Sequence, residues 1–146
     1  MTAQESLSLL RRGLLVLLVI GAVGLLGELV LLEHYEDTPQ FIPFGLLTLT
    51  LLVTGWHWLD GGKRSLRWFQ AVMMLLIIAG PVGMFLHLRG NWEAERDFDP
   101  SLLGLDLWVT VLRGEAPTLA PDTLVQFGLL GLLYAYKHPA LDSKEG

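Results

Sequence analysis

Four apolar stretches alternate with polar segments along the chain, at residues 13–32, 41–59, 68–88 and 123–136. Each of the first three is about 20 residues long, the length at which a helix crosses the hydrocarbon core of a bilayer. The fourth is shorter, in a range where re-entrant segments compete with true spans. Charged residues on both of its flanks favour a span. The pattern therefore predicts spans at about 13–33, 41–59, 68–88 and 121–137, in one all-α, integral membrane four-helix bundle covering residues 1–146.

Composition supports a membrane location. Hydrophobic residues make up 52% of the 146 residues, more than one small soluble domain can bury. The chain contains no Cys, which excludes disulfides and thiolate metal sites within it. The first apolar stretch is longer than the core of a secretory signal and lacks a following small-residue cleavage site. We expect an uncleaved anchor.

The polar segments carry charge of opposite character. Lys and Arg gather at the N-terminus, between spans two and three, and after span four: Arg11, Arg12, Lys63, Arg64, Arg67, Lys137 and Lys144. Most carboxylates lie in the other two connections: Glu33, Glu36, Asp37, Glu93, Glu95, Asp97, Asp99, Asp106, Glu115 and Asp122. Because basic loops stay on the cytoplasmic side, we predict a multi-pass protein of a bacterial inner membrane, with both termini cytoplasmic and the acidic loops periplasmic.

The segment between spans three and four holds one further helix. Asp99 is a favourable N-cap and Pro100 a favourable first helical residue, and Gly114 fits a C-terminal stop. The apolar residues between them are too few to span. We predict a short amphipathic helix at about 100–113 that lies on the outer leaflet or over the bundle mouth.

Small and polar residues share one face of each span at helical spacing. Gly21, Gly24 and Glu28 do so in span one, and Thr50, Thr54 and His57 in span two. Further stripes run through Gly80, Gly83 and His87, and through Gly128 and Gly131. Because small residues let helices approach closely in lipid, we expect these faces inside the bundle.

Glu28 is the candidate for chemistry, because a carboxylate within a span is expensive. Burial between helices is expected, with Arg89 or His87 as a polar partner and Tyr35 on the continuation of the same face. The alternative is a proton-coupled or cation-coupled role for its carboxylate.

The acidic rim offers oxygen and imidazole ligands for a divalent cation, namely Glu33, His34, Asp37, Glu93 and Glu95. A solvated acidic surface explains the same residues. The four histidines form two pairs, His34 with His87 and His57 with His138, one near each leaflet. Such pairs are the axial ligands of a di-haem bundle, although all four lie at or beyond helix ends.

No nucleotide loop, hydrolase triad or nucleic-acid patch is visible. We expect a non-enzymatic membrane component that acts in the lipid bilayer with a membrane or periplasmic protein partner, or as a homo-oligomer, through its acidic rim. Two alternatives remain: a small cation-coupled transporter using Glu28, and a haem protein for electron transfer. No resident cofactor is expected, with haem and a divalent cation as the alternatives.

Overall fold

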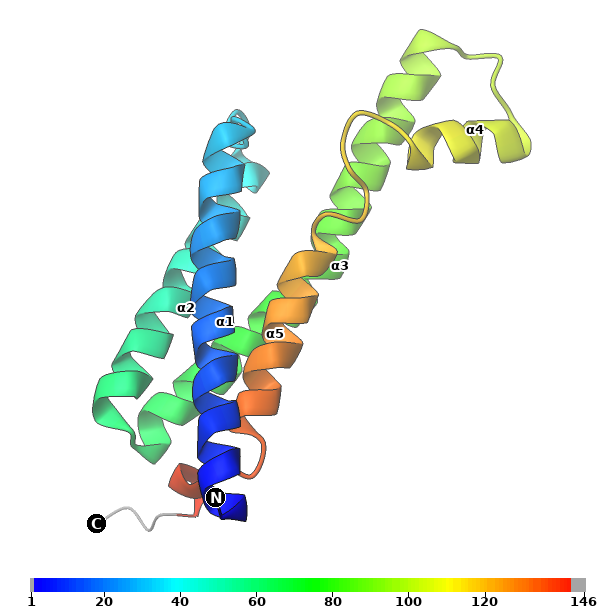
Figure 1. Cartoon of the computed structure of the whole chain (residues 1–146). Coiled ribbons are helices and arrows are strands. Elements are labelled where there is room, and N and C mark those ends of the chain that lie inside the picture. Colours follow the sequence, from blue (N-terminus) through cyan, green and yellow to red (C-terminus); the bar gives the residue numbers. More distant parts are fainter. Residues whose placement is uncertain (1, 143–146) are drawn as a thin grey trace.

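The computed structural model describes residues 2–142, and helices are the regular elements of that range (Figure 1). They are α1 (Ala3–Leu31), η1 (Thr38–Gln40), α2 (Phe41–Asp60), α3 (Lys63–Phe98), α4 (Gly104–Leu112), α5 (Asp122–Ala135) and η2 (Pro139–Leu141), where η marks a 3-10 helix. Residues 2–142 contain no strand. The all-α prediction is therefore confirmed.

Three helices are long and apolar enough to cross a membrane: α1, α2 with its preceding turn, and α3. Helix α5 is apolar but has 14 residues, which corresponds to about 21 Å along its axis. The predicted fourth span is thus a helix, and it is shorter than the hydrocarbon core of a bilayer. Its crossing of the membrane stays a prediction.

The connections gather at two ends of the molecule. The N-terminus, the turn between α2 and α3, and η2 lie at one end, and the α1–α2 connection and α4 lie at the other (Figure 1). This is the arrangement that the charge pattern predicts. We call them the basic end and the acidic end. Lys144 and the C-terminal residue, which the prediction places with the basic end, lie outside the described residues.

Helix α1 begins at Ala3, well before the predicted start near residue 13. A reciprocal cap explains the difference. The backbone N–H of Glu5 donates to the Thr2 hydroxyl at 3.2 Å, and the backbone N–H of Thr2 donates to the Glu5 carboxylate at 2.7 Å. These bonds satisfy donors at the start of the helix, so Arg11 and Arg12 lie within α1 rather than before it.

Helix α3 continues through Pro81 and past residue 88 to Phe98. Its 36 residues correspond to about 54 Å, far more than a span needs. The next helix begins at Gly104, so the predicted start at residue 100 was wrong. The Asp99 carboxylate instead accepts the backbone N–H and the hydroxyl of Ser101, at 3.0 and 2.6 Å. Those bonds hold a turn that competes with helix.

The buried Asn91 side chain joins the end of α4 and the segment after it to α3. Its Nδ2 donates to the carbonyls of Val111 at 3.0 Å and Ala116 at 2.8 Å, and its Oδ1 accepts the Ala116 N–H at 3.0 Å. Trp92 of α3 and Trp108 of α4 pack with ring centroids 5.0 Å apart. Helix α4 is therefore fixed against the outer part of α3 and projects sideways from it (Figure 1).

Helices α3 and α5 make the closest packing in the bundle. A Cβ at Gly128 would lie 2.6 Å from the Met73 carbonyl oxygen, and a Cβ at Gly131 would overlap the Met73 side chain. Gly80 faces Val125 in the same way. The predicted inward orientation of these small residues is confirmed, as is that of the fully or nearly buried Thr50, Thr54 and His57 in α2.

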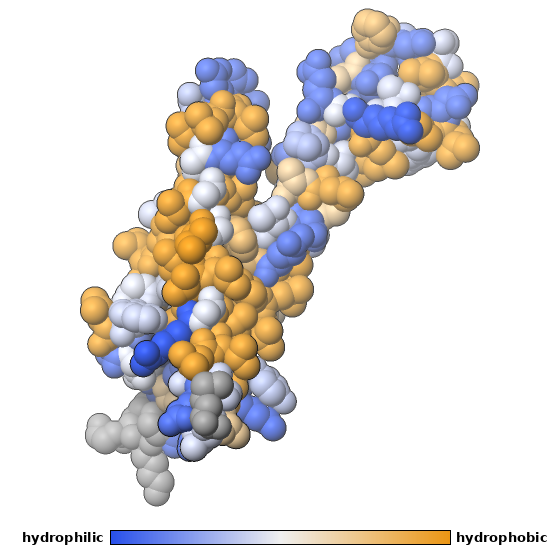
Figure 2. Space-filling view, in the orientation of Figure 1, coloured by the Kyte–Doolittle hydropathy of each residue, from blue (hydrophilic) through white to orange (hydrophobic). Residues whose placement is uncertain are grey.

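The molecule opens toward its acidic end. Helices α1 and α2 form one arm, the outer part of α3 with α4 forms the other, and a notch separates them (Figure 2). Gly21 of α1 still packs on Phe127 of α5, whereas Gly24 has no atom near its Cβ position. The face of α1 that is covered at Gly21 thus becomes uncovered about one turn later.

Candidate functional site

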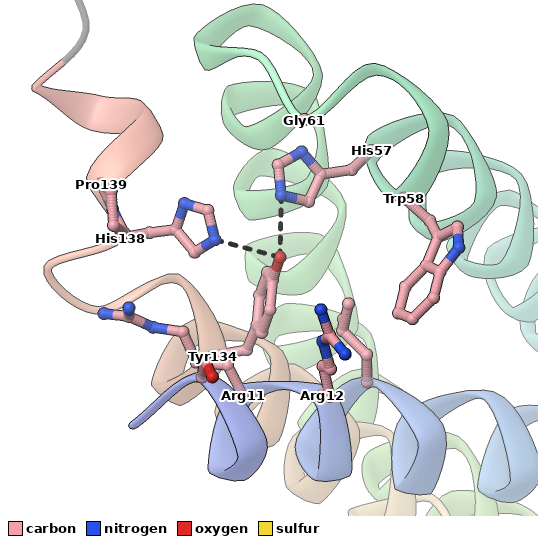
Figure 3. Close-up of a pocket in the computed structure, with 10 residues that line it drawn as sticks. Arg11, Arg12, His57, Trp58, Gly61, Tyr134, His138 and Pro139 are labelled. Carbon is pink, nitrogen blue, oxygen red and sulfur yellow. Dashed lines mark hydrogen bonds between the residues drawn. The ribbon is translucent and has the colours of Figure 1, made fainter. Parts of the chain in front are cut away.

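His57 is the centre of a buried hydrogen-bond network at the basic end. Its side chain is 2% exposed, and both ring nitrogens have partners. Nδ1 lies 3.0 Å from the Ser65 hydroxyl of α3, and Nε2 lies 2.9 Å from the Tyr134 hydroxyl of α5 (Figure 3). One imidazole therefore joins α2, α3 and α5.

The network extends in both directions from His57. The Ser65 hydroxyl donates to the Asp60 carboxylate at 2.6 Å. The Tyr134 hydroxyl lies 3.2 Å from His138 Nε2 (Figure 3), and His138 Nδ1 accepts the Ala140 N–H at 3.2 Å. We call the five side chains of Asp60, His57, Ser65, Tyr134 and His138 the basic-end network.

The hydrogen bonds of the network all point the same way, with each side chain from His138 to Ser65 donating to the next one toward Asp60. A backbone N–H can only donate, so Nδ1 of His138 carries no proton and its Nε2–H donates to Tyr134. A carboxylate only accepts, so the Ser65 hydroxyl hydrogen belongs to Asp60 and its oxygen accepts from His57. The Tyr134 hydroxyl then donates to His57 Nε2. This pattern assigns both tautomers from their partners, with both imidazoles neutral.

The turn after α2 positions this network. Gly61 has φ +62°, the left-handed conformation that ends many helices. The Gly62 N–H then donates to the Asp60 carboxylate at 3.0 Å. The same turn brings Ser65, in the first turn of α3, beneath His57. Two adjacent glycines thus let a helix hairpin close tightly enough for a contact between residues eight apart.

An open pocket of about 490 Å³ adjoins the network. Its lining comes from α1, α2 and the end of α5: Ser8, Arg11, Arg12, Leu15, His57, Trp58, Gly61, Tyr134, His138 and Pro139. Arg11 donates to the carbonyls of Tyr136 at 3.2 Å and Lys137 at 2.8 Å, which lie just after the C-terminal end of α5. Among the described residues, this lining contains two guanidinium groups and no carboxylate.

Burial lowers the pKa of His138 below its ordinary value, and the charge that His57 can carry and the Arg11 guanidinium lower it further. This direction agrees with the hydrogen bonds, because a neutral His138 is needed to accept the Ala140 N–H.

At the acidic end the structure brings together His34 and His87, whose ring centroids are 5.9 Å apart. His87 Nδ1 donates to the Pro117 carbonyl at 3.0 Å. Burial, and next to it the charge that His87 can carry, lowers the pKa of His34. The segment after α1 and the helix α3 are therefore close to each other at these two rings.

The prediction that Glu28 is buried between helices is wrong, because its side chain is exposed. Residues 2–142 offer it no hydrogen bond or ion pair. The expected partner Arg89 instead donates from Nε to Glu93 at 2.7 Å, with both side chains exposed. The reason is the splay of the arms: Glu28 shares its face with Gly21 and Gly24, beyond the point where α5 covers that face. Tyr35 is exposed as well.

The remaining candidate ligands stay apart. Within residues 2–142, no group of three or more His, Cys, Asp or Glu side chains is placed to hold a metal ion. Glu33, His34, Asp37, Glu93 and Glu95 are therefore not gathered into a cluster. Glu93 is held by Arg89 instead.

Both predicted histidine pairs are neighbours in space. The rings of His57 and His138 have centroids 5.4 Å apart, and the Tyr134 hydroxyl contacts a nitrogen of each. Axial ligation of haem needs one unprotonated ring nitrogen from each histidine directed at the iron. In the basic-end pair those nitrogens are directed at protein partners, so this geometry does not fit a porphyrin between the rings.

Sequence reasoning missed Tyr134, Ser65 and Asp60. One signal was available: Tyr134 and His138 are four residues apart, the spacing at which side chains meet on a helical face. The long-range contact of His57 with Tyr134 had no counterpart in the sequence pattern.

The comparisons with known proteins give one partial similarity. The chain is 34% identical over 86 residues to the methylamine utilization ferredoxin-type protein MauN of Methylobacillus flagellatus. The matched stretch covers 56% of this chain and 29% of that protein, so the chain spans less than a third of the relative's length. No family model and no solved structure matches the chain.

Proposed function

We propose that this chain is a non-enzymatic membrane component that acts with a protein partner in an accessory role to electron transfer. Three long apolar helices support the membrane setting. The partial similarity to a ferredoxin-type protein supports the connection with electron transfer. The basic end would lie in the cytoplasm and the acidic end in the periplasm of a bacterial inner membrane, as the charge pattern favours.

The electron carrier would belong to the partner. Ferredoxins hold iron–sulfur clusters through Cys thiolates, and these 146 residues contain no Cys. The residues present therefore do not fit such a cluster. An accessory component that anchors or positions a carrier needs no cluster ligands of its own.

The proposal of a protein partner rests on the outer part of α3. This helix is about 54 Å long against a hydrocarbon core of about 30 Å, so its outer turns extend beyond the span and hold α4 there through Asn91. Glu93, Glu95 and Asp97 lie on this extension. We propose that these three carboxylates of the acidic end contact a partner of basic surface, or cations.

Photo-crosslinking in living cells tests the proposal. A photoreactive amino acid at Asp97, exposed at the acidic end, is compared with one at Asp142, exposed at the basic end. We expect a discrete adduct from position 97 alone, and mass spectrometry should identify its second chain as an electron-transfer protein. An adduct with another copy of this chain would favour a homo-oligomer instead. The absence of any adduct at position 97 would contradict the proposed contact.

A further inference from the structure

Among the described residues, one guanidinium group of the basic-end pocket has no carboxylate partner. Arg12 extends from α1 into the pocket, between the side chains of Tyr134 and Trp58 (Figure 3). Within residues 2–142, no hydrogen bond or ion pair holds its guanidinium; the one salt bridge in that range is Arg89–Glu93, at the acidic end. A charged fork with five donors is thus available to a ligand.

Within residues 2–142, the lining of the pocket around Arg12 adds a second guanidinium group and no carboxylate. Arg11 lines the same pocket, and its Nη2 alone makes the bonds to the carbonyls of Tyr136 and Lys137. Its remaining N–H groups are not used in those bonds. The nearby carboxylate of Asp60 is occupied by Ser65 and by the Gly62 N–H, and it does not line the pocket.

In a bilayer crossed by α1 and α2, the pocket would lie near the level where hydrocarbon meets water. It is at the basic end of α1 and α2, both long enough to span, and its wall includes the exposed indole of Trp58. Tryptophan favours the headgroup region. A ligand here would therefore have phosphate oxygens within reach of Arg12 and apolar surface beside it.

We propose that the basic-end pocket binds a phosphate group, with Arg12 as its principal ligand and Arg11 as a supporting charge. Guanidinium groups match the geometry of phosphate oxygens through paired hydrogen bonds. Two sources share this chemistry, the headgroup of an anionic phospholipid and a soluble phosphate. This inference does not depend on the proposed role in electron transfer.

Binding to the full chain in detergent tests the inference. Native mass spectrometry and titration calorimetry are performed with short-chain phosphatidylglycerol and, separately, with inorganic phosphate. We expect Arg12→Gln to weaken binding about tenfold, as expected for the loss of one charge-assisted pair of hydrogen bonds. Arg67→Gln is the matched control, since it removes the same charge at the same end outside the pocket, and it should change affinity less than about twofold. Arg12→Lys should fall between, because it keeps the charge and loses the fork.

The outcomes distinguish a lipid headgroup from a soluble phosphate, and both from a pocket that binds no phosphate. Binding of phosphatidylglycerol without binding of inorganic phosphate assigns a lipid headgroup, and binding of both assigns a phosphate site open to soluble ligands. Equal losses for Arg12→Gln and Arg67→Gln, or no binding of either probe by the unaltered chain, would overturn the proposal. Arg12 would then serve only to offset the negative ends of α2 and α5. Because Arg12→Lys retains that offset, it also decides the question if Arg12→Gln does not fold.

Discussion

Tyr134 links two imidazoles that would otherwise face each other across the end of the bundle. Its hydroxyl satisfies the acceptor of His57 and the donor of His138. A buried polar group that loses its partner retains its full desolvation penalty, so this one oxygen affects two neighbours.

We expect Tyr134→Phe to lower the free energy of unfolding by roughly 1–3 kcal/mol, because it leaves polar nitrogens unpaired at a mostly buried position. The measurement is reversible unfolding in mixed detergent. Tyr136→Phe is the control, since Tyr136 is exposed and its hydroxyl has no hydrogen bond among the described residues. Equal stability of the two variants would show that the network contributes nothing to the fold.

His138 makes the C-terminal turn sensitive to acid. Its pKa is lower in the folded chain than the ordinary 6.5, through burial first and then the charge that His57 can carry and the Arg11 guanidinium. The unfolded chain therefore binds a proton more readily, and the resulting stability is full above pH 6.5 and is lost as pH falls through the folded value. Protonation of Nδ1 also removes the acceptor of the Ala140 N–H. We expect hydrogen exchange of the Ala140 amide, corrected for its intrinsic pH dependence, to lose protection as pH falls below about 6.5. In His138→Gln this loss should be absent.

Glu28 should tolerate the loss of its charge. Because its side chain is exposed and has no polar partner within residues 2–142, Glu28→Gln is expected to leave the melting temperature unchanged. Arg89→Gln serves as a comparison that removes a charge from an exposed pair. A clear loss of stability in Glu28→Gln would indicate a partner contributed by another chain. Loss of a cation-dependent proton release with the fold intact would instead favour the transport alternative.

Among the elements, those defined by periodicity were predictable and those defined by local caps or long-range contacts were not. The sequence predicted α2 closely, because Pro39 and the Asp60–Gly61–Gly62 turn mark its limits. It did not predict the early start of α1, which a single pair of side chains determines, or the outer extension of α3. The site was predicted only as histidine pairs. Tyr134 lies between His57 and His138 because of the rotation of α5 about its own axis relative to α3. The glycine stripe predicts that the two helices pack closely, but it does not predict that rotation.

The α3–α5 contact should be the most sensitive helix interface to added volume. A Cβ at Gly128 would lie 2.5 Å from the Ile77 side chain and 2.6 Å from the Met73 carbonyl. Because backbone cannot move aside easily, we expect Gly128→Ala to destabilise the fold by about 1–3 kcal/mol. Gly24→Ala has open space around it and should be neutral or stabilising by up to about 1 kcal/mol. Equal effects in an unfolding assay would contradict the packing described.

At the scale of the whole molecule, the charge pattern predicts which end faces the cytoplasm. The chain lacks Cys, so single cysteines can report it directly. We expect Asp97→Cys to react with a membrane-impermeant maleimide in intact cells, and Arg64→Cys to react only after permeabilisation. Asp142→Cys tests the short helix α5: protection in intact cells supports a crossing, and labelling would make α5 re-entrant. All three positions are exposed, so differences in labelling report sidedness.

One continuous rod joins the two ends of this protein. Asn91, which holds the segment after α4, and Ser65, which contacts His57, belong to the same helix and lie about 39 Å apart along its axis. Among the described helices, the outer part of that helix contacts only α4, whereas its inner part is packed on α2 and α5 as far as the contact of Gly83 with Pro121. Asn91 lies about 12 Å beyond that contact, so a tilt of about 10° there would move Asn91 by about 2 Å. A load applied to α4 would therefore act first on the α3–α5 contact near Gly83, the fulcrum of a short lever.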